Sequence, residues 1–285
     1  MYSPDFAYHR ATSLSAAHAL LAENPGAKVI AGGHSLIPLL KLRLASPVAL
    51  IDIGRIAELR GISQSGDTIR IGALTTHSEL ASSAVLKKSA AALAEAAGQV
   101  GDPAVRNRGT IGGNIAHADP ASDLPTVLVA LGAQIVAARA QGERTIPAEK
   151  FFTGIMTTSL EEDEIVAAVM VPASGAGQGS AYVKFSHPAS RYAVVGAAAL
   201  VTRQGGKCTA ARVAIGGLVP FARRAPSVER ALIGTAADEA VIQAAAALIS
   251  NDLGKDVAGD IFASADYRAG VAPTYVKRAL TAAVR

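Results

Sequence analysis

Cysteine and tryptophan are scarce in this chain: its 285 residues include one cysteine, Cys208, and no tryptophan. One thiol cannot form a disulfide within the chain. It also cannot supply the several cysteine ligands of an iron–sulfur cluster or a cysteine-rich zinc site. Cys208 lies in an apolar segment that predicts a strand, so we expect a small buried side chain rather than a reactive thiol. The lack of a disulfide framework favours the cytoplasm.

Long apolar runs and concentrated positive charge are also missing. No stretch approaches the roughly 20 apolar residues of a membrane span, and the first residues lack the basic and apolar regions of a signal peptide. The 27 Lys and Arg residues slightly outnumber the 23 Asp and Glu residues, for a net charge of +4. The basic residues are scattered and form no stripe interleaved with aromatics, so no nucleic-acid partner is predicted.

What is present is a composition suited to a folded core. Half of the residues are hydrophobic, 18% are charged and only 4% are aromatic, so the predicted core is built mainly from small side chains. At about 150 residues per domain, the length predicts roughly two domains. The small and polar residues 172–180 form the best candidate linker between them.

The segment before this linker predicts short helices and strands. Ser13 is a candidate N-cap for a helix through about residue 22. Residues 28–31 and 48–53 predict strands around a short helix at 36–44, which is the size of a minimal parallel unit. Further expected elements are strands at 68–71, 133–139 and 165–171, helices at 86–100 and 122–130, and a glycine-rich loop at 101–114.

The segment after the linker predicts strands first and helices last. The turn Gln204-Gly205-Gly206-Lys207 favours a hairpin between two of the strands. The expected strands are 181–186, 193–202 and 208–216, and the expected helices are 227–232, 237–251 and 265–284. Together the two halves predict an α+β fold, with a three-stranded antiparallel sheet and a helical bundle at the C-terminal end.

Two loops with paired glycines are the strongest candidates for a ligand site. Residues 31–35 read A-G-G-H-S, and residues 110–114 read T-I-G-G-N. Paired glycines let a ligand approach the backbone closely, and successive N–H groups favour an anion. Each loop alone is as consistent with a tight turn, and the first matches neither common nucleotide fingerprint. Together, about 80 residues apart, they suggest a two-part clamp on one long polyphosphate ligand.

These motifs resemble the FAD-binding medium subunits of molybdenum hydroxylases, which include the carbon monoxide dehydrogenase medium subunit and are similar to the flavin domain of xanthine dehydrogenase. The resemblance rests on A-G-G-H-S-L at 31–36, T-I-G-G-N-I at 110–115 and A-D-P-A-S-D-L-P at 118–125. It extends over essentially the whole chain, including the Tyr182-Val-Lys-Phe185 strand.

The resemblance implies two domains. The first is a two-lobed FAD-binding domain of the vanillyl-alcohol-oxidase (PCMH) type over residues 1–174, with lobes at about 1–53 and 54–174. The second is a carbon monoxide dehydrogenase flavoprotein C-terminal domain over residues 180–285. The FAD diphosphate is expected between the two glycine loops. Positions carried over from the family as cofactor contacts are Ala31, Gly32, Gly33, His34, Ser35, Leu36, Thr110, Ile111, Gly112, Gly113, Asn114, Asp123, Lys184 and Tyr192.

Three of these positions have specific expected roles. A carboxylate beside a diphosphate would repel it, so Asp123 is expected to meet a hydroxyl instead. Lys184 is expected near the flavin, where a cation stabilises the anionic reduced ring, and Tyr192 is expected over one ring face. Without the resemblance, Lys184 reads as a solvated strand residue and Tyr192 as a core aromatic. No residue is assigned as a general acid, a general base or a metal ligand.

The remaining polar residues have weaker assignments. His34 is expected to contribute only its backbone to the first loop. The acidic run at residues 161–164 most simply predicts a solvated turn. His77 and His187 carry no assignment, and His117 is open between a cofactor contact and none. Arg106 and Arg108 are open between phosphate, a partner subunit and a solvated loop.

For function, the resemblance implies an oxidoreductase subunit that holds FAD in a heterotrimer, which is expected to be doubled. A large subunit would hold the molybdenum cofactor, and a small subunit would hold two [2Fe–2S] clusters that pass electrons to this flavin. An external acceptor would then take the electrons, which allows peripheral membrane association through that acceptor. The substrate (carbon monoxide, an aldehyde, a purine or another N-heterocycle) cannot be read from this chain. The alternatives are a self-contained flavin oxidase and a nucleotide-binding protein without flavin.

Overall fold

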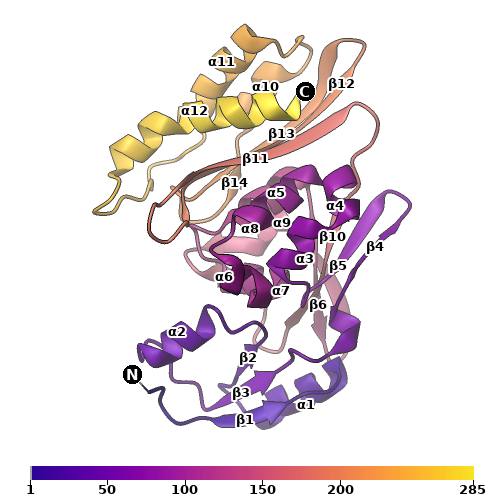
Figure 1. Ribbon diagram of the computed structural model, residues 1–285, viewed down its shortest axis with the longest axis vertical. Helices are drawn as coiled ribbons and strands as arrows, with labels where there is room; N and C mark the ends of the chain where they lie inside the picture. The colour runs from indigo at the N-terminus through magenta and orange to yellow at the C-terminus, as the bar shows by residue number, and fades with distance from the viewer. Residues whose placement is uncertain (1) are drawn as a thin grey trace.

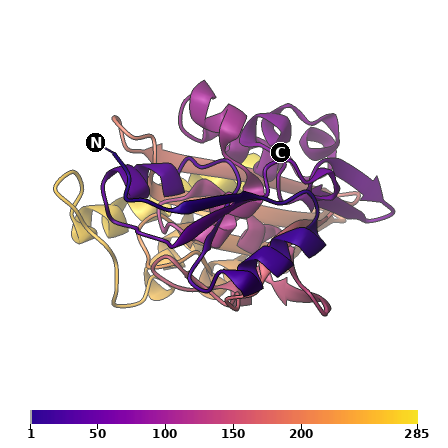
Figure 2. The same cartoon turned by 90° about the horizontal axis from the view of Figure 1, so that it is seen from below.

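The computed structural model describes residues 2–285, which form three main sheets arranged along the long axis of the molecule (Figure 1). The first is a parallel sheet of order β1-β3-β2. This sheet and α1 lie nearest the viewer when the molecule is seen from below (Figure 2). The predicted parallel unit is confirmed, and Ser13 Oγ caps α1 by accepting from the Ala16 N–H. The elements are β1 (Ala7–Arg10), α1 (Leu14–Glu23), β2 (Lys28–Ile30), α2 (Leu36–Lys41) and β3 (Ala49–Asp52).

The second sheet is antiparallel throughout, with the order β4-β5-β10-β6-β7. Its strands are β4 (Ile62–Ser65), β5 (Thr68–Gly72), β6 (Gln134–Arg139), β7 (Gly142–Pro147) and β10 (Ile165–Pro172). The segments around it are η1 (Ala57–Leu59), α3 (His77–Ser82), α4 (Ala84–Ser89), α5 (Ala91–Gln99), α6 (Pro103–Arg108), α7 (Ile111–His117), α8 (Asp123–Leu131), α9 (Ala148–Phe151), β8 (Phe152–Gly154) and β9 (Thr157–Thr158).

Two expectations for this region are wrong. The single helix expected at 86–100 is broken at Ala90, which leaves the helical region (φ −158°, ψ 54°) and is fully buried. Alanine favours helix in any position, so its abundance gave no sign of the break. The loop expected at 101–114 contains α6 and the start of α7. Asp102 caps α6, and Pro103 occupies its first turn, where a missing N–H does no harm.

The third sheet has the order β11-β12-β13-β14, built from β11 (Gln178–Ser186), β12 (Ala193–Gln204), β13 (Lys207–Gly216) and β14 (Arg223–Arg224). Gln204 pairs with Lys207, which confirms the predicted hairpin. The expected three strands are joined by a fourth, β14, which is too short to have a sequence pattern of its own. The helices that follow are α10 (Pro226–Leu232), α11 (Glu239–Ala247), η2 (Leu248–Asn251) and α12 (Ala265–Ala283).

Both faces of this third sheet are covered. Alternate residues of β12 join different cores: Ala197 packs with the C-terminal helices, and Ala198 packs with the core around α5 and α8. α12 lies along the outer face of β11 and β12 (Figure 1). The inner face therefore brings side chains of β11, such as Lys184, against the start of α8.

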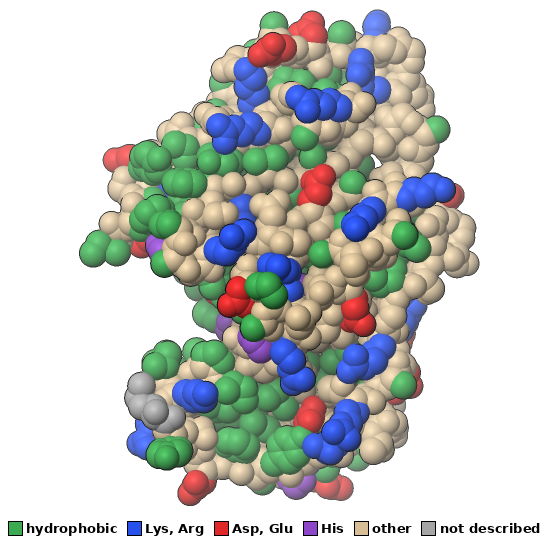
Figure 3. Space-filling view, in the orientation of Figure 1, with side chains coloured by type: hydrophobic (Ala, Val, Ile, Leu, Met, Phe, Trp, Pro, Cys, Tyr) green, Lys and Arg blue, Asp and Glu red, His purple; other side chains and the backbone are tan. Residues whose placement is uncertain are grey.

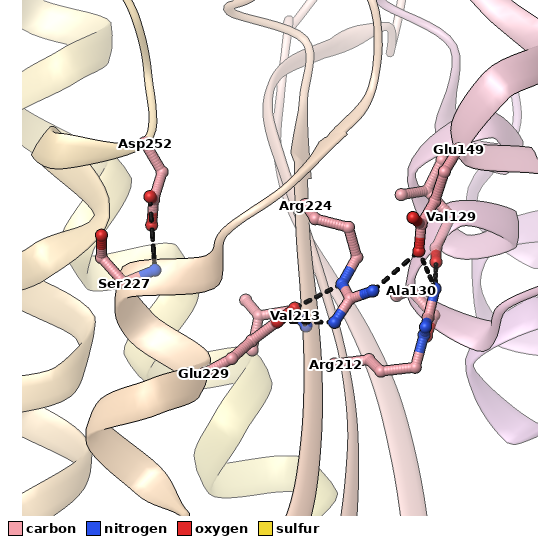
Figure 4. A network of polar contacts seen from close by, with 9 residues as sticks. All are labelled: Val129, Ala130, Glu149, Arg212, Val213, Arg224, Ser227, Glu229 and Asp252. Carbon is pink, nitrogen blue, oxygen red and sulfur yellow. Dashed lines mark hydrogen bonds and ion pairs between the residues drawn. The ribbon is translucent and has the colours of Figure 1, made fainter.

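Arginines of the third sheet reinforce this contact (Figure 4). Arg212 donates to the carbonyls of Val129 and Ala130, both at 3.0 Å, and so satisfies free groups at the C-terminal end of α8. Arg212 and Arg224 both pair with Glu149 of α9. These contacts are half-buried, so each stabilises modestly, but together they hold the sheet to the α8–α9 corner. None of the helices within residues 2–285 is long and apolar enough to cross a membrane.

Candidate cofactor site

One cavity of about 820 Å³ is lined by both glycine loops and by residues in or next to each of the three main sheets. Its wall includes residues 31–36, 109–110 and 112–114, the 156–166 segment, and residues 190–192 between β11 and β12, whereas Ile111 is fully buried and does not line it. The volume falls within the range of pockets that hold cofactor-sized molecules. The cavity therefore brings together, from distant parts of the chain, most of the positions that the sequence singled out.

The first glycine loop presents free backbone donors. Gly33 has a φ of +75°, and a Cβ there would lie 3.0 Å from Ile37 Cγ1. Within residues 2–285, the N–H groups of residues 32–35 donate to no protein acceptor, and Ser35 Oγ makes no capping bond. His34 Nδ1 lies 3.2 Å from the Gly32 carbonyl, so its side chain folds back on the loop. This arrangement leaves a concave row of donors, which suits an anion.

The second glycine loop uses its donors internally. The N–H groups of Ile111 and Gly112 donate to the carbonyls of Thr75 and Ala73 at 3.0 and 2.8 Å. Thr110 Oγ1 caps α7 by accepting from the Gly113 N–H at 3.1 Å. The Asn114 N–H bonds to the Thr110 carbonyl. The sequence suggested that the N–H groups of both loops serve the ligand, but the structure leaves those of residues 32–35 free and bonds those of residues 111–114 within the protein.

What the second loop offers the cavity is a bare glycine and an amide. Gly113 is exposed and lines the cavity, and a Cβ there would lie 4.0 Å from Ala31 Cβ, so the two loops approach each other at this point. Ser122 Oγ donates to Asn114 Oδ1 at 2.9 Å, which fixes the amide oxygen, and the NH₂ group of this cavity residue has no acceptor within residues 2–285. Ser122 was expected to cap α8, but its side chain makes no capping bond.

Asp123 lies at the start of α8, buried and fully hydrogen-bonded. The Tyr182 hydroxyl donates to its Oδ1 at 2.6 Å, and Lys184 Nζ donates to its Oδ2 at 2.9 Å. Burial raises the pKa of Asp123 above its ordinary value, and the charge of Lys184 partly opposes that rise. The hydroxyl that Asp123 meets in this structure belongs to Tyr182 of the protein, whereas the sequence predicted one on the cofactor.

Lys184 is neither solvated nor part of the cavity wall. Its ammonium uses its three N–H donors on Asp123, on the Gln99 carbonyl at 2.9 Å and on the Arg191 carbonyl at 2.7 Å. Arg191 has a φ of +61°, a conformation that non-glycine residues seldom adopt. Lys184 thus links α5, α8 and the strained turn that immediately precedes Tyr192.

Tyr192 lies at the C-terminal-sheet end of the cavity, with its side chain partly exposed and lining the wall. Partial burial, together with the charges of Asp119 and Asp123, raises the pKa of its phenol. The group therefore stays protonated near neutral pH. Sequence reasoning had placed it either over a flavin ring or in the core. The structure places it at the cavity, and its contact with a ring stays a prediction.

Two cavity residues escaped the sequence reasoning. His77, at the first position of α3, is 3% exposed, and its Nδ1 has no partner among the described residues. Burial lowers the pKa of His77 to about 4, aided by the charges of His34 and Arg106. Glu164 was expected in a solvated turn, but it is buried, and Arg144 and Arg139 hold its pKa at about 2. The burial of His77 and the pairing of Glu164 have no local sequence signal, because each depends on residues from other segments.

This combination fits a dinucleotide cofactor such as FAD. A diphosphate needs donors and space for close approach, which the first loop and Gly113 provide. Two models of known protein families agree with that assignment. One, described as the FAD binding domain in molybdopterin dehydrogenase, matches residues 4–174. The other, described as the CO dehydrogenase flavoprotein C-terminal domain, matches residues 180–283. The fold and site thus define an FAD-binding protein.

Relatives that align over nearly their whole length identify the family of FAD-binding proteins to which the chain belongs. The carbon monoxide dehydrogenase medium chain of Hydrogenophaga pseudoflava is 42% identical over 99% of this chain and 98% of its own length. The 6-hydroxypseudooxynicotine dehydrogenase complex subunit alpha of Paenarthrobacter nicotinovorans is 41% identical over 100% of this chain and 96% of its own. The chain belongs to the FAD-binding medium subunits of molybdenum hydroxylases, which are components of oxidoreductases. The resemblance seen in the sequence is therefore confirmed.

A comparison with solved structures supports the same family. A chain of carbon monoxide dehydrogenase from Hydrogenophaga pseudoflava, in a form that lacks the Mo-pyranopterin moiety of the molybdenum cofactor, matches with a TM-score of 0.95. The two sequences are 44% identical, and the match covers 99% of this chain and 98% of that one. The α+β fold expected from the sequence is confirmed.

Proposed function

We propose that this chain is an electron relay: its FAD takes electrons from the [2Fe–2S] clusters of a small partner subunit and passes them to an external acceptor. The observation that carries the proposal is that one cavity contacts the first glycine loop, Gly113 and Tyr192. When bound, FAD supplies chemistry in steps of one or two electrons. This chain's residues hold the cofactor and set access to it.

In the proposed binding mode, the free N–H groups of residues 32–35 bind the diphosphate. Gly113 allows the close approach of the diphosphate, and the unpaired NH₂ group of Asn114 donates to phosphate or ribityl oxygens. Tyr192 lies against the flavin ring and limits access to one face. Lys184 and Asp123 stabilise the turn that carries Tyr192, since Lys184 donates to the carbonyl of Arg191, the residue before it.

A relay needs no general acid or base, and the site is consistent with this. Both oxygens of Asp123 are engaged, by Tyr182 and Lys184, so the carboxylate has no free role as a proton acceptor. Glu164 is likewise paired with two arginines, and its low pKa keeps it ionised. A self-contained oxidase would need a free acid or base to act on a substrate, and neither of these two buried carboxylates is free.

The assembly and the domain division are parts of the same proposal. We place the FAD-binding domain at residues 1–174, with lobes at about 1–53 and 54–174, and the C-terminal domain at 180–285. The full enzyme is proposed as a doubled heterotrimer in the cytoplasm, with the molybdenum cofactor on a large subunit and membrane contact only through the acceptor. Two relatives with 42% and 41% identity are named for different substrates, which supports substrate selection outside this chain.

Rapid-mixing experiments on the FAD-loaded full chain test the relay. We expect no flavin bleaching with alcohols or aldehydes, and rapid bleaching when the reduced iron–sulfur subunit is added. Turnover of a substrate by the isolated chain, without molybdenum or iron, would instead establish an oxidase. Tyr192→Ala should change the rate of flavin reoxidation while leaving FAD content unchanged, and Tyr192→Phe serves as its control. Equal reoxidation rates in all three proteins would contradict the proposed placement of Tyr192.

A further inference from the structure

A second cavity, of about 530 Å³, lies against the same glycine loop. It shares Ala31, Gly32, Gly33 and Thr110 with the first cavity, so the glycine loop is a common wall between them. Most of the rest of its lining comes from β1, β3, the segment after β3 and the end of α6. We call it the arginine hollow, after its four basic residues Arg10, Arg55, Arg60 and Arg108.

The hollow carries an excess of positive charge. Asp52 is its one acidic residue, and this carboxylate already accepts from the Tyr8 hydroxyl and from the Gly54 N–H at 2.7 Å. Arg10 lies 3.8 Å from Asp52, whereas Arg55 and Arg108 have no hydrogen-bond or ion-pair partner within residues 2–285. Blue side chains gather where the lower part of the molecule meets its middle (Figure 3). Four arginines at one hollow stand out in a chain whose net charge is only +4.

The geometry points to a site for a phosphate or diphosphate group of a small molecule. We propose that the arginine hollow binds such an anion and that its occupancy weakens FAD binding across the shared wall. Guanidinium groups match phosphate oxygens in pairs, and Asn107 adds an amide at the same wall. A concave space of this size suits a small molecule better than a flat protein surface.

The coupling follows from charge. This part of the proposal rests on the proposed placement of the FAD diphosphate at residues 31–35. An anion in the hollow would repel that diphosphate through a wall only one loop thick and would neutralise the arginines behind it. By linkage, FAD would weaken anion binding by the same factor.

Calorimetry with inorganic pyrophosphate tests the site on the FAD-loaded full chain, with chloride used to keep ionic strength constant. We expect one saturable site, at least tenfold weaker in Arg55→Gln/Arg108→Gln. The control Lys207→Gln/Arg230→Gln, which removes two exposed charges from the C-terminal region, should bind as the parent does. No saturable heat, or equal binding by the hollow variant, would overturn the proposal. It would also fail if the hollow variant bound pyrophosphate normally and lost only assembly with partner subunits.

The rate of FAD release after dilution, followed by flavin fluorescence, tests the coupling. Pyrophosphate should speed release several-fold in the parent and the control variant but not in the hollow variant. Simple competition for the vacated FAD site cannot change this first-order rate. Release that is indifferent to pyrophosphate would overturn the coupling. A misplaced diphosphate would show separately, as normal FAD affinity in a Gly113 variant.

Discussion

The two glycine pairs look alike in sequence but are used differently. In the first loop, residues 32–35 leave their N–H groups free. In the second loop, residues 111–114 bond every N–H to the protein, and Gly112 packs on Ala73. One pair therefore presents donors to a ligand, whereas the other joins the wall to the core and leaves Gly113 as open surface. Similar motifs can thus divide one task between a binding loop and a supporting loop.

The largest effect is expected where a glycine has no room for a Cβ. A Cβ at Gly32 would lie 2.1 Å from the Arg108 carbonyl oxygen, and one at Gly112 would lie 2.6 Å from Ala73 Cβ. Gly32→Ala and Gly112→Ala should each destabilise the protein by up to about 3 kcal/mol and abolish FAD retention. Thermal unfolding and the flavin-to-protein ratio measure this. An unchanged melting temperature in both would show that these glycines do not serve packing.

The second effect concerns His77, which packs on Gly109 at the entry to the second loop. Its pKa is about 4 when folded and 6.5 ordinarily, so below pH 6.5 the unfolded chain takes up a proton that the folded chain refuses. The free energy of unfolding is therefore unaffected by His77 protonation at neutral pH and falls as pH drops from 6.5 towards 4. The loss is about 2 kcal/mol at pH 5. Denaturant unfolding from pH 7 to 5 measures this, and His77→Gln should flatten the profile. An equally steep profile in that variant would assign the effect elsewhere.

Gly113 should separate ligand binding from folding. Its φ is ordinary, and a Cβ there meets only Thr110 Oγ1 at 3.0 Å and Ala31 Cβ at 4.0 Å. Gly113→Val should weaken FAD at least tenfold, about 1.4 kcal/mol, because the side chain fills the gap between the loops. The melting temperature of the FAD-free protein should barely change. Gly270→Val, at an open position on α12, is the matched control. Normal FAD affinity in Gly113→Val would refute the clamp.

The smallest effect compares the two loop hydroxyls. Thr110 caps α7, so Thr110→Ala should lower stability by about 1 kcal/mol, and Thr110→Ser should restore it. Ser35 makes no capping bond, so Ser35→Ala should leave the FAD-free protein unchanged and reduce only FAD affinity. Unfolding of FAD-free protein and flavin titration distinguish the two. Equal losses of stability would mean that the loops do not differ as described.

Local patterns in the sequence predicted the features that depend on local chemistry. Ser13 caps α1 because its hydroxyl reaches an N–H three residues on, and the hairpin at 204–207 follows from two adjacent glycines. The two glycine loops could be predicted because each contains a pair of adjacent glycines, which can be read directly from the sequence. The break at Ala90, the strand β14 and the burial of Glu164 were not visible, since each depends on residues distant in the chain.

By itself, therefore, the sequence determined the family, the α+β order of elements and the two loops that face the cavity. Only the tertiary structure decided which loop keeps its N–H groups free, because Thr75 and Ala73, which accept from Ile111 and Gly112 of the second loop, come from a separate segment packed against it. It also decided that Lys184 is buried, since its three acceptors come from α5, α8 and the turn before Tyr192. The charge of a side chain follows from the residue type alone, but its partners depend on which segments pack against it.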